Sequence, residues 1–325
     1  MLSHTLKATG RSLMLSIGRA GVRVGSVVSP ERTARHIAQQ FFTTMRTAPE
    51  RRRFGAETPR VASVQLNDGP VVSYTWGDIE RAPTVLLVHG WNGWAQQLEC
   101  FVEPLREQGY AVVAFDHVAH GASIGAQASL PVMVRSVRAM LQRLRQPAGA
   151  IAHSLGAAAV AGVMVSDPHL VPAAVLIAPP TDPRPYLRWV ARGLGTPDAL
   201  LDSVQREAET TAGVPLASLV VDETFARQIE QPLLVVHDVN DAEVTISNGR
   251  VYAQAPQARM LATDGLGHRR VISDPHVVQT GVQFLIEWRK AAPEVEVATD
   301  VFTPAVEAPC GREHREMLAD FGAMC

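Results

Sequence analysis

Ser154 lies in the pentapeptide Ala152-His153-Ser154-Leu155-Gly156, whose composition suits nucleophilic chemistry. A short apolar run over residues 149–151 precedes the pentapeptide, and an alanine-rich segment that favours a helix follows it. A serine between a strand and a helix, with small residues two positions away on either side, predicts a sharp turn that exposes the hydroxyl. The usual signature of this turn is Gly-x-Ser-x-Gly, and this chain has Ala152 at the first glycine.

A serine hydroxyl is a weak nucleophile near neutral pH, so it needs a base, an acid that orients the base, and donors for the oxyanion. After a turn of this kind, the acid and then the histidine follow the serine along the chain. Asp241 comes shortly after the apolar run 233–237, and His268 lies in a glycine-rich loop after the next apolar run. Open α/β sheets place their sites at such strand ends. Asp182, which follows an earlier strand, remains an alternative acid.

Oxyanion donors are expected from two backbone segments. The apolar run Thr84–Val88 ends in the glycine-rich segment His89-Gly90-Trp91-Asn92-Gly93. A turn of this composition can direct a backbone N–H toward a developing negative charge. The second donor is expected at Leu155, directly after the serine.

Strands and helices are predicted to alternate along the chain after one β-hairpin. This alternation is typical of the α/β class, with a mainly parallel central sheet flanked by helices. The hairpin strands are predicted at Val61–Leu66 and Val71–Trp76. The parallel strands are predicted at Thr84–Val88, Ala111–Phe115, Gly149–His153, Ala173–Ala178, Leu233–His237 and Ala258–Ala262. The helices of the core are predicted near Ala95–Gln108, Pro131–Arg145, Leu155–Ser166, Ile246–Ala253 and Pro275–Lys290.

Five segments together resemble the α/β-hydrolase fold family, and in particular its esterases, lipases and acylaminoacyl-peptidase-like members. They lie within roughly residues 59–290 and are His89–Gly93, Phe115–Ser123, Ala152–Gly156, His237–Val244 and Gly265–His268. The resemblance implies Ser154 as nucleophile, Asp241 as orienting acid and His268 as base. It also implies that the backbone N–H groups of Trp91 and Leu155 form the oxyanion hole.

The chain departs from the family pattern at two positions. Ala152 replaces a glycine, which crowds the tight turn by one methyl group. Asp238 stands where the family often has glycine, which affects the expected geometry of the loop that carries Asp241.

The strand pattern lapses over residues 181–231, which are predicted to form a helical insertion between two core strands. In the hydrolases that this chain resembles, such an insertion is a cap that shapes the substrate pocket. Tyr186, Leu187 and Trp189 of this insertion, together with His153 beside the nucleophile, are therefore the predicted pocket residues.

Charge distinguishes the two ends of the chain from the core. Residues 1–60 contain 11 Lys or Arg against 3 Asp or Glu, whereas the tail from residue 291 onward is acidic. The basic segment predicts a helix packed on the domain, with weak peripheral contact with an anionic membrane surface as the alternative. The predicted division begins with a helical extension at 1–58 and a core formed by 59–180 and 232–290. A cap at 181–231 interrupts the core, and a mobile tail at 291–325 contains a short helix near Glu313–Phe321.

Composition excludes several other classes of protein. The 325-residue chain has a net charge of −2, and its three cysteines favour a reducing compartment such as the cytoplasm. It contains no apolar run of about 18 residues, no phosphate-binding or dinucleotide-binding glycine motif, and no basic-aromatic pattern typical of nucleic-acid binding. We expect no metal and no cofactor, and the sequence does not indicate the oligomeric state.

The sequence therefore predicts a serine hydrolase that cleaves a small-molecule carboxylic ester through an acyl-enzyme intermediate. A thioesterase, a peptidase or an acyltransferase would use the same three residues, so these activities remain alternatives. A non-catalytic binding protein with this fold is the alternative from another class.

Overall fold

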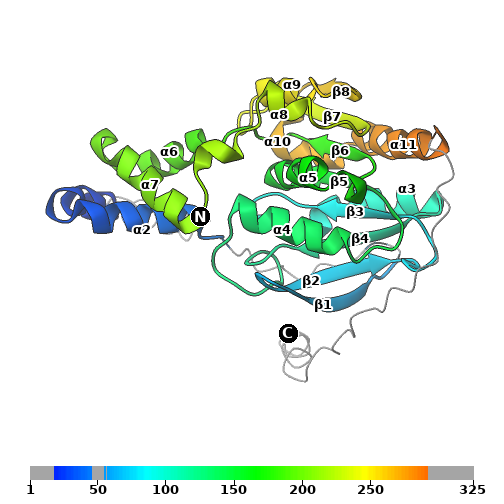
Figure 1. Cartoon of the computed structure of the whole chain (residues 1–325), viewed down its shortest axis with the longest axis horizontal. Helices are drawn as coiled ribbons and strands as arrows, with labels where there is room; N and C mark the ends of the chain where they lie inside the picture. The colour runs from blue at the N-terminus through cyan, green and yellow to red at the C-terminus, as the bar shows by residue number, and fades with distance from the viewer. Residues whose placement is uncertain (1–17, 46–54, 56, 292–325) are drawn as a thin grey trace, which may run out of the picture.

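The computed structural model describes residues 18–45, 55 and 57–291. An eight-stranded sheet forms the centre of the molecule, in the order β1-β2-β4-β3-β5-β6-β7-β8 (Figure 1). The strands are β1 (Arg60–Leu66), β2 (Gly69–Trp76), β3 (Thr84–Val88), β4 (Ala111–Asp116), β5 (Pro147–His153), β6 (Ala174–Ile177), β7 (Leu233–Asp238) and β8 (Ala258–Thr263). The hairpin β1–β2 joins the sheet with β2 antiparallel to β4. The other six strands, β3 to β8, are all parallel to one another. The predicted α/β architecture is thus confirmed.

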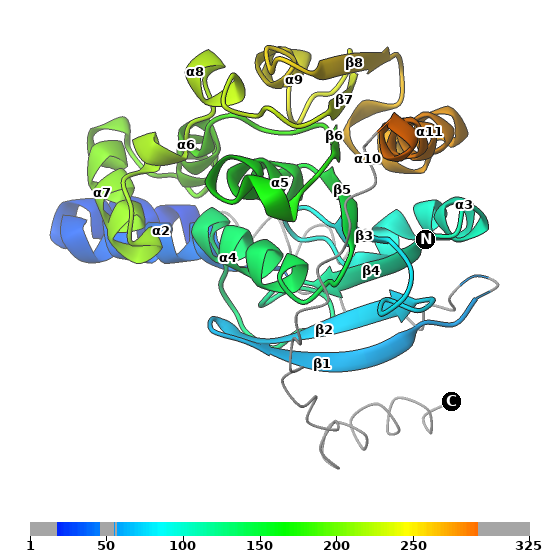
Figure 2. The same ribbon diagram turned by 45° about the vertical axis from the view of Figure 1, so that its right-hand side comes forward.

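Helices cover both faces of the sheet (Figure 2). One face carries α4 (Leu130–Leu141), α5 (Leu155–Ser166) and α9 (Ile246–Tyr252), and the other carries η1 (Ala95–Phe101), α3 (Val102–Glu107) and α11 (Pro275–Ala291). Shorter helical turns lie at η2 (Pro168–Leu170), α10 (Gly267–Arg270) and η5 (Val271–Ser273).

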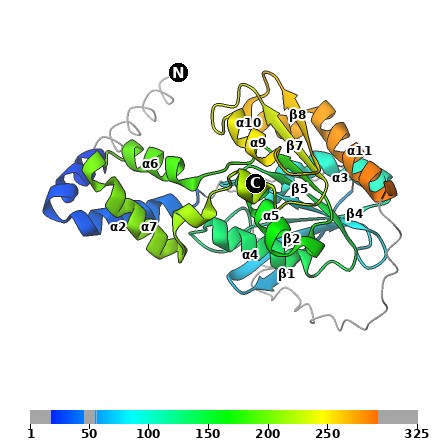
Figure 3. The ribbon, with the colours of Figure 1, turned by 45° about the horizontal axis from the view of Figure 1, so that its top comes forward.

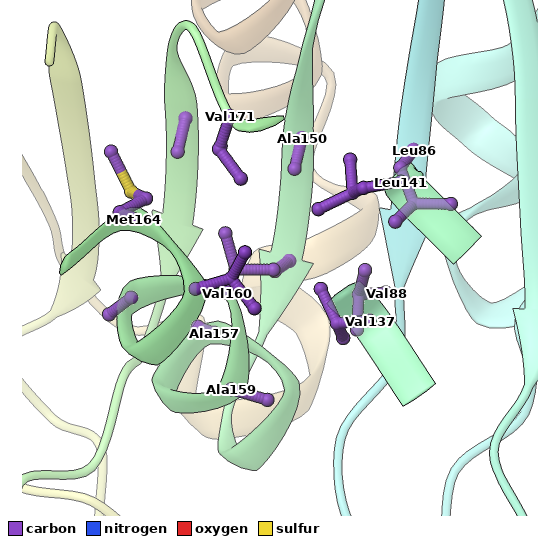
Figure 4. Close-up of a cluster of buried hydrophobic side chains, with 14 of the residues drawn as sticks. Leu86, Val88, Val137, Leu141, Ala150, Ala157, Ala159, Val160, Met164 and Val171 are labelled. Atoms are coloured by element: carbon purple, nitrogen blue, oxygen red, sulfur yellow. The ribbon is translucent and has the colours of Figure 1, made fainter. Parts of the chain in front are cut away.

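The alternation of side chains along β3 explains why the core forms two layers. Leu86 and Val88 pack toward α4 and α5, whereas Val85 and Leu87 pack toward the opposite helices. Figure 4 shows the first layer, in which Leu86 and Val88 lie beside side chains of α4. Because both faces are covered, the central parallel strands are continuous apolar runs.

The insertion between β6 and β7 contains α6 (Pro183–Gly193), η3 (Asp198–Leu200), α7 (Leu201–Ala212), η4 (Leu216–Leu219) and α8 (Glu223–Ala226). Helix α2 (Pro30–Phe42) from the N-terminal extension packs on α6 and α7. These three helices share an apolar core separate from the sheet, and we call them the helical lobe. Figure 3 shows the lobe projecting from the sheet.

Helix α2 of the N-terminal extension therefore packs on the insertion rather than on the sheet. Residues 18–28 are also helical and lead into α2. The extension before residue 18, the predicted helix at Glu313–Phe321 and the acidic tail after Ala291 lie outside the described residues.

Candidate active site

Ser154 occupies a sharp turn between β5 and α5, as the sequence predicts. Its backbone dihedrals are φ 52° and ψ −126°, a conformation that is strained for a residue with a side chain. Hydrogen bonds hold the turn on both sides, because Ser154 N–H donates to the Ile177 carbonyl at 2.8 Å and Ala157 N–H donates to the Ser154 carbonyl at 2.9 Å. The surrounding sheet and helix thus compensate the local strain.

Glycine is required at the close approaches around this turn. A Cβ on Gly156 would lie 2.2 Å from the His89 carbonyl oxygen, and a Cβ on Gly90 would lie 2.9 Å from the Ser154 Cβ. The end of β3 and the start of α5 therefore touch through backbone atoms. Ala152, in contrast, lies inside β5 and is fully buried in the core, where its methyl group packs.

The structure brings three predicted residues into one chain of hydrogen bonds. The Ser154 Oγ lies 3.0 Å from the His268 Nε2, and the His268 Nδ1 lies 2.7 Å from the Asp241 Oδ2. A carboxylate only accepts hydrogen bonds, so Nδ1 carries the proton and Nε2 is free to accept one from the serine. His268 is on α10 after β8, and Asp241 is in the loop after β7.

Asp241 is held as an anion at the end of β7. Its Oδ1 accepts hydrogen bonds from the N–H groups of Glu243 at 2.9 Å and Val244 at 2.8 Å. Burial alone would raise the pKa of Asp241, but the hydrogen bonds from His268 and from these backbone groups bring it below its ordinary value.

The alternative acid, Asp182, has a different role. It caps the N-terminus of α6 through the N–H of Arg184, and both of its oxygens bind the Arg184 guanidinium at 2.7–3.0 Å. Asp241, not Asp182, is therefore the carboxylate that contacts His268.

The loop after β3 lies against Ser154, as expected for an oxyanion donor. The Gly90 carbonyl accepts hydrogen bonds from His89 Nδ1–H at 2.7 Å and from Gly93 N–H at 3.0 Å. Because the C=O and N–H of a trans peptide point in opposite directions, the N–H of Trp91 points away from these two groups. Leu155 is the first residue of α5, where backbone N–H groups have no partner within the helix.

The predicted pocket residues have different environments. His153 is buried, and its Nε2–H donates to the His268 carbonyl at 2.9 Å, so it contacts the backbone of the base on α10. Burial, and then the neighbouring His268, lowers the pKa of His153 to about 3. Tyr186 is partly exposed and its hydroxyl donates to the Glu243 carbonyl beside Asp241.

The prediction for Leu187 is wrong, because its side chain is 1% exposed and lies in the apolar core of the helical lobe. Trp189, two residues further along α6, is 73% exposed. An α-helix turns by 100° per residue, so neighbouring residues of a short apolar stretch need not face the same side.

Asp238 is a residue whose importance the sequence did not reveal. It is fully buried at the end of β7 and accepts hydrogen bonds from Asn240 N–H at 3.0 Å, Thr263 Oγ1–H at 2.8 Å and Leu266 N–H at 2.9 Å. Burial alone would raise the pKa of Asp238, but the backbone hydrogen bonds, first that of Leu266, bring it below its ordinary value. The carboxylate thus joins β7 to β8 and to the loop before His268.

A buried polar cluster supports the loop after β3. Asp116 accepts hydrogen bonds from Ala95 N–H at 2.7 Å, Ala122 N–H at 2.8 Å and the Tyr74 hydroxyl at 3.1 Å, so it fixes two loops. Nearby His89, His117 and His120 are buried with ring centroids 4.8–6.2 Å apart, and burial lowers the pKa of each.

In the part of the chain that the structure describes, no group of three or more His, Cys, Asp or Glu is arranged to hold a metal ion. No helix there has the length and apolar character that crossing a membrane requires.

Comparisons with known proteins place the chain among hydrolases. The model of the family Hydrolase_4, described as serine aminopeptidase S33, matches residues 80–259. No curated protein matches the chain. The esterase of Pyrococcus furiosus is similar in structure, with a TM-score of 0.56 and 21% identity over 76% of this chain and 99% of that one.

Two other solved structures are similar at comparable levels. The thioesterase domain from the curacin biosynthetic pathway has a TM-score of 0.54 and 17% identity over 71% of this chain and all of that one. A bacterial membrane phospholipase A described as a virulence factor has a TM-score of 0.54 and 19% identity, over 89% of this chain and 99% of that one. At these identities the likeness shows the fold.

Proposed function

This chain belongs to the serine aminopeptidase S33 family of α/β hydrolases, and on that premise we propose that it cleaves carboxylic esters with Ser154 as the nucleophile. The observation that carries the proposal is the continuous hydrogen-bond chain from Ser154 through His268 to Asp241. A serine activated by a histidine, which a carboxylate orients in turn, is the arrangement that acyl transfer needs.

In the proposed reaction, His268 accepts the hydroxyl proton of Ser154 through Nε2 while Oγ attacks the ester carbonyl carbon. Asp241 keeps the proton of His268 on Nδ1 and stabilises the imidazolium that forms. The ester C–O bond then breaks, and the alcohol leaves with the proton from His268. A water molecule gives a proton to His268 Nε2 as it attacks the acyl carbon; the bond from that carbon to Ser154 Oγ then breaks, His268 returns the proton to Oγ, and the carboxylic acid leaves.

The negative charge that forms on the carbonyl oxygen would be stabilised by the N–H groups of Trp91 and Leu155. The first residue of α5 supplies a backbone donor at the positive end of a helix dipole. The contact between Gly90 and Ser154 supports the position of the other donor beside the nucleophile. One such donor contributes about 3–4 kcal/mol to transition-state stabilisation.

The helical insertion would act as a cap that shapes the substrate pocket. Tyr186 supports this role, because its hydroxyl contacts the Glu243 carbonyl in the loop of Asp241. Leu187 instead stabilises the lobe, and we assign no pocket role to the exposed Trp189, which lies one helical turn before Gly193 at the end of α6.

Two of the similar solved structures are an esterase and a phospholipase, and both names support an ester as the substrate rather than another acyl compound. A thioesterase and a peptidase are the alternatives, since a thioesterase domain is among the similar structures and the family description names an aminopeptidase. All three activities share the acyl-enzyme step, and they differ in the group that leaves.

Labelling with a fluorophosphonate probe tests the nucleophile. We expect covalent labelling of the wild-type protein and none of Ser154→Ala. Ser166→Ala is a matched control, because Ser166 lies at the other end of α5 and is exposed. Equal labelling of wild-type protein and Ser154→Ala, or no labelling of folded wild-type protein, would refute the proposal.

A substrate panel then separates the three activities. We expect turnover of p-nitrophenyl esters of increasing chain length to exceed turnover of acyl-CoA thioesters and of aminoacyl p-nitroanilides. A kcat/KM that is highest for an anilide or a thioester would replace the ester by that substrate class, while labelling of Ser154 would remain.

A further inference from the structure

The helix of residues 18–28 presents three large apolar side chains to solvent. Val24, Val27 and Val28 are 64%, 84% and 78% exposed. Their spacing of three and four residues puts them on one side of the helix, whereas Val22 packs on the core of the helical lobe. Valine is also a poor helix former, so neither packing among the described residues nor helix propensity accounts for these three valines.

Arginines accompany the valines. Arg19 and Arg23 are exposed on the same helix, and residues 18–45 contain four arginines but only one acidic residue. The Arg19 side chain donates to the Gly193 carbonyl at 2.9 Å, which fixes the start of this helix to the end of α6. The helix is thus held in place with its apolar side outward.

An exposed tryptophan lies close to the same end of the lobe. Trp189 is on α6, about one helical turn before Gly193, to which Arg19 is bonded. Tryptophan favours the boundary between water and lipid, because its ring is apolar and its N–H is polar. Apolar side chains next to arginines are typical of helices that lie in the surface of an anionic bilayer.

We propose that Val24, Val27 and Val28, with Arg23, form a peripheral docking surface for an anionic lipid bilayer. We call these four residues the valine face. The valines enter the boundary between headgroups and acyl chains, and Arg23 binds a lipid phosphate, while Arg19 holds the helix on the lobe. In Figure 3 the helix of residues 18–28 (blue) lies at the end of the lobe away from the sheet, so the protein would bind through the lobe. This inference is independent of the reaction at Ser154.

The size of the valine face favours a lipid surface over a second copy of the chain. A stable protein–protein interface covers about 800 Å² on each partner, which is much more than three valine side chains provide. A bilayer needs only shallow insertion of a few side chains together with electrostatic attraction. The excess of arginine matches the negative charge of such a bilayer and would repel an identical face.

Sedimentation of the full chain with lipid vesicles tests the proposal. We expect binding to vesicles that contain about one third phosphatidylglycerol, weaker binding to pure phosphatidylcholine, and release at high salt. The triple variant Val24→Ser/Val27→Ser/Val28→Ser should bind the anionic vesicles about tenfold more weakly. Arg23→Gln should weaken binding about fivefold.

Val61→Ser is the matched control, because Val61 is 46% exposed on β1, which belongs to the sheet. It should bind like the wild-type protein, and circular dichroism should show that all variants are folded. Unchanged binding of the triple variant, or equal binding to neutral and anionic vesicles, would overturn the proposal. A dimer in light scattering that the triple variant converts to a monomer, without vesicle binding, would instead identify a second copy as the partner.

Discussion

Replacing Asp238 by asparagine should weaken both the fold and the placement of His268. The carboxylate accepts one hydrogen bond through Oδ1 from Asn240, and two through Oδ2 from Thr263 and Leu266. An asparagine has one acceptor oxygen, so its amide N–H₂ must face a backbone N–H on one side. The best orientation keeps the two bonds to the β8 side and leaves the Asn240 N–H without its partner.

The expected cost follows from these three bonds. Hydrogen bonds to a charged group contribute about 1.5–3 kcal/mol and neutral ones about 0.5–1.5 kcal/mol, so loss of the charge weakens each remaining bond by about 1 kcal/mol. The Asn240 N–H, which is only partly buried, adds about 1 kcal/mol when it loses its partner. The free energy of unfolding should therefore fall by about 3 kcal/mol, a large part of the 5–15 kcal/mol typical of folded proteins.

Urea unfolding followed by tryptophan fluorescence measures this change, and the rate of fluorophosphonate labelling measures the effect on the site. Because Leu266 precedes His268 by two residues, a displacement of about 1 Å there should slow labelling by about 100-fold. Thr263→Val is the matched control, since it removes a single donor to the carboxylate; it should cost about 1.5 kcal/mol and leave the Leu266 contact and the labelling rate unchanged. An Asp238→Asn protein with wild-type stability and labelling rate would refute this account of the buried carboxylate.

Three further predictions follow from buried positions. Gly156→Ala should reduce the free energy of unfolding by about 1–3 kcal/mol and slow fluorophosphonate labelling, because the new Cβ would lie 2.2 Å from the His89 carbonyl oxygen. The control is Gly162→Ala on the same helix, whose Cβ would meet only a side chain at 3.2 Å, so this variant should be tolerated. The pKa values of His89 and His120, lowered from 6.5 to about 4 mainly by burial, should make the fold acid-sensitive. Above pH 6.5 the two histidines are neutral in the folded and in the unfolded protein. As the pH falls toward 4, the unfolded chain binds protons first, so each histidine should lower the free energy of unfolding by about 2 kcal/mol at pH 5. Equal urea midpoints at pH 7 and pH 5 would contradict this. Leu187→Ala should cost about 3 kcal/mol and expose α2 to trypsin, whereas unchanged cleavage would indicate that the lobe does not depend on this side chain.

Much of the fold could be predicted because it follows from local patterns. The apolar run Thr84–Val88 is β3 with the same bounds, and Leu155–Ser166 is α5 with the same bounds. All of β3 is buried and so is most of α5, so the apolar composition of the two segments identifies them. The predicted helix Ala95–Gln108 is less regular, since it divides into η1 and α3.

The chemistry of the site was partly readable for a related reason. A strained serine turn needs small neighbours, and strand ends carry the acid and the base, so residue order already indicated Ser154, Asp241 and His268. The choice between Asp182 and Asp241 was not local. It depended on which carboxylate reaches His268. The Asp182 carboxylate is paired with the guanidinium of Arg184, whereas Asp241 bonds His268.

The sequence by itself thus determined the order of strands and helices, the serine turn and the charge of the N-terminal extension, because each is a property of neighbouring residues. Only the tertiary structure decided that the Ser154 Oγ lies 3.0 Å from the His268 Nε2, although the two residues are 114 positions apart in the chain. It also decided that Asp238 joins two strands and that Leu187 belongs to the lobe core with α2. The physical reason is that these contacts join segments distant in the chain, and their geometry is set by packing of the whole sheet and lobe rather than by local preference.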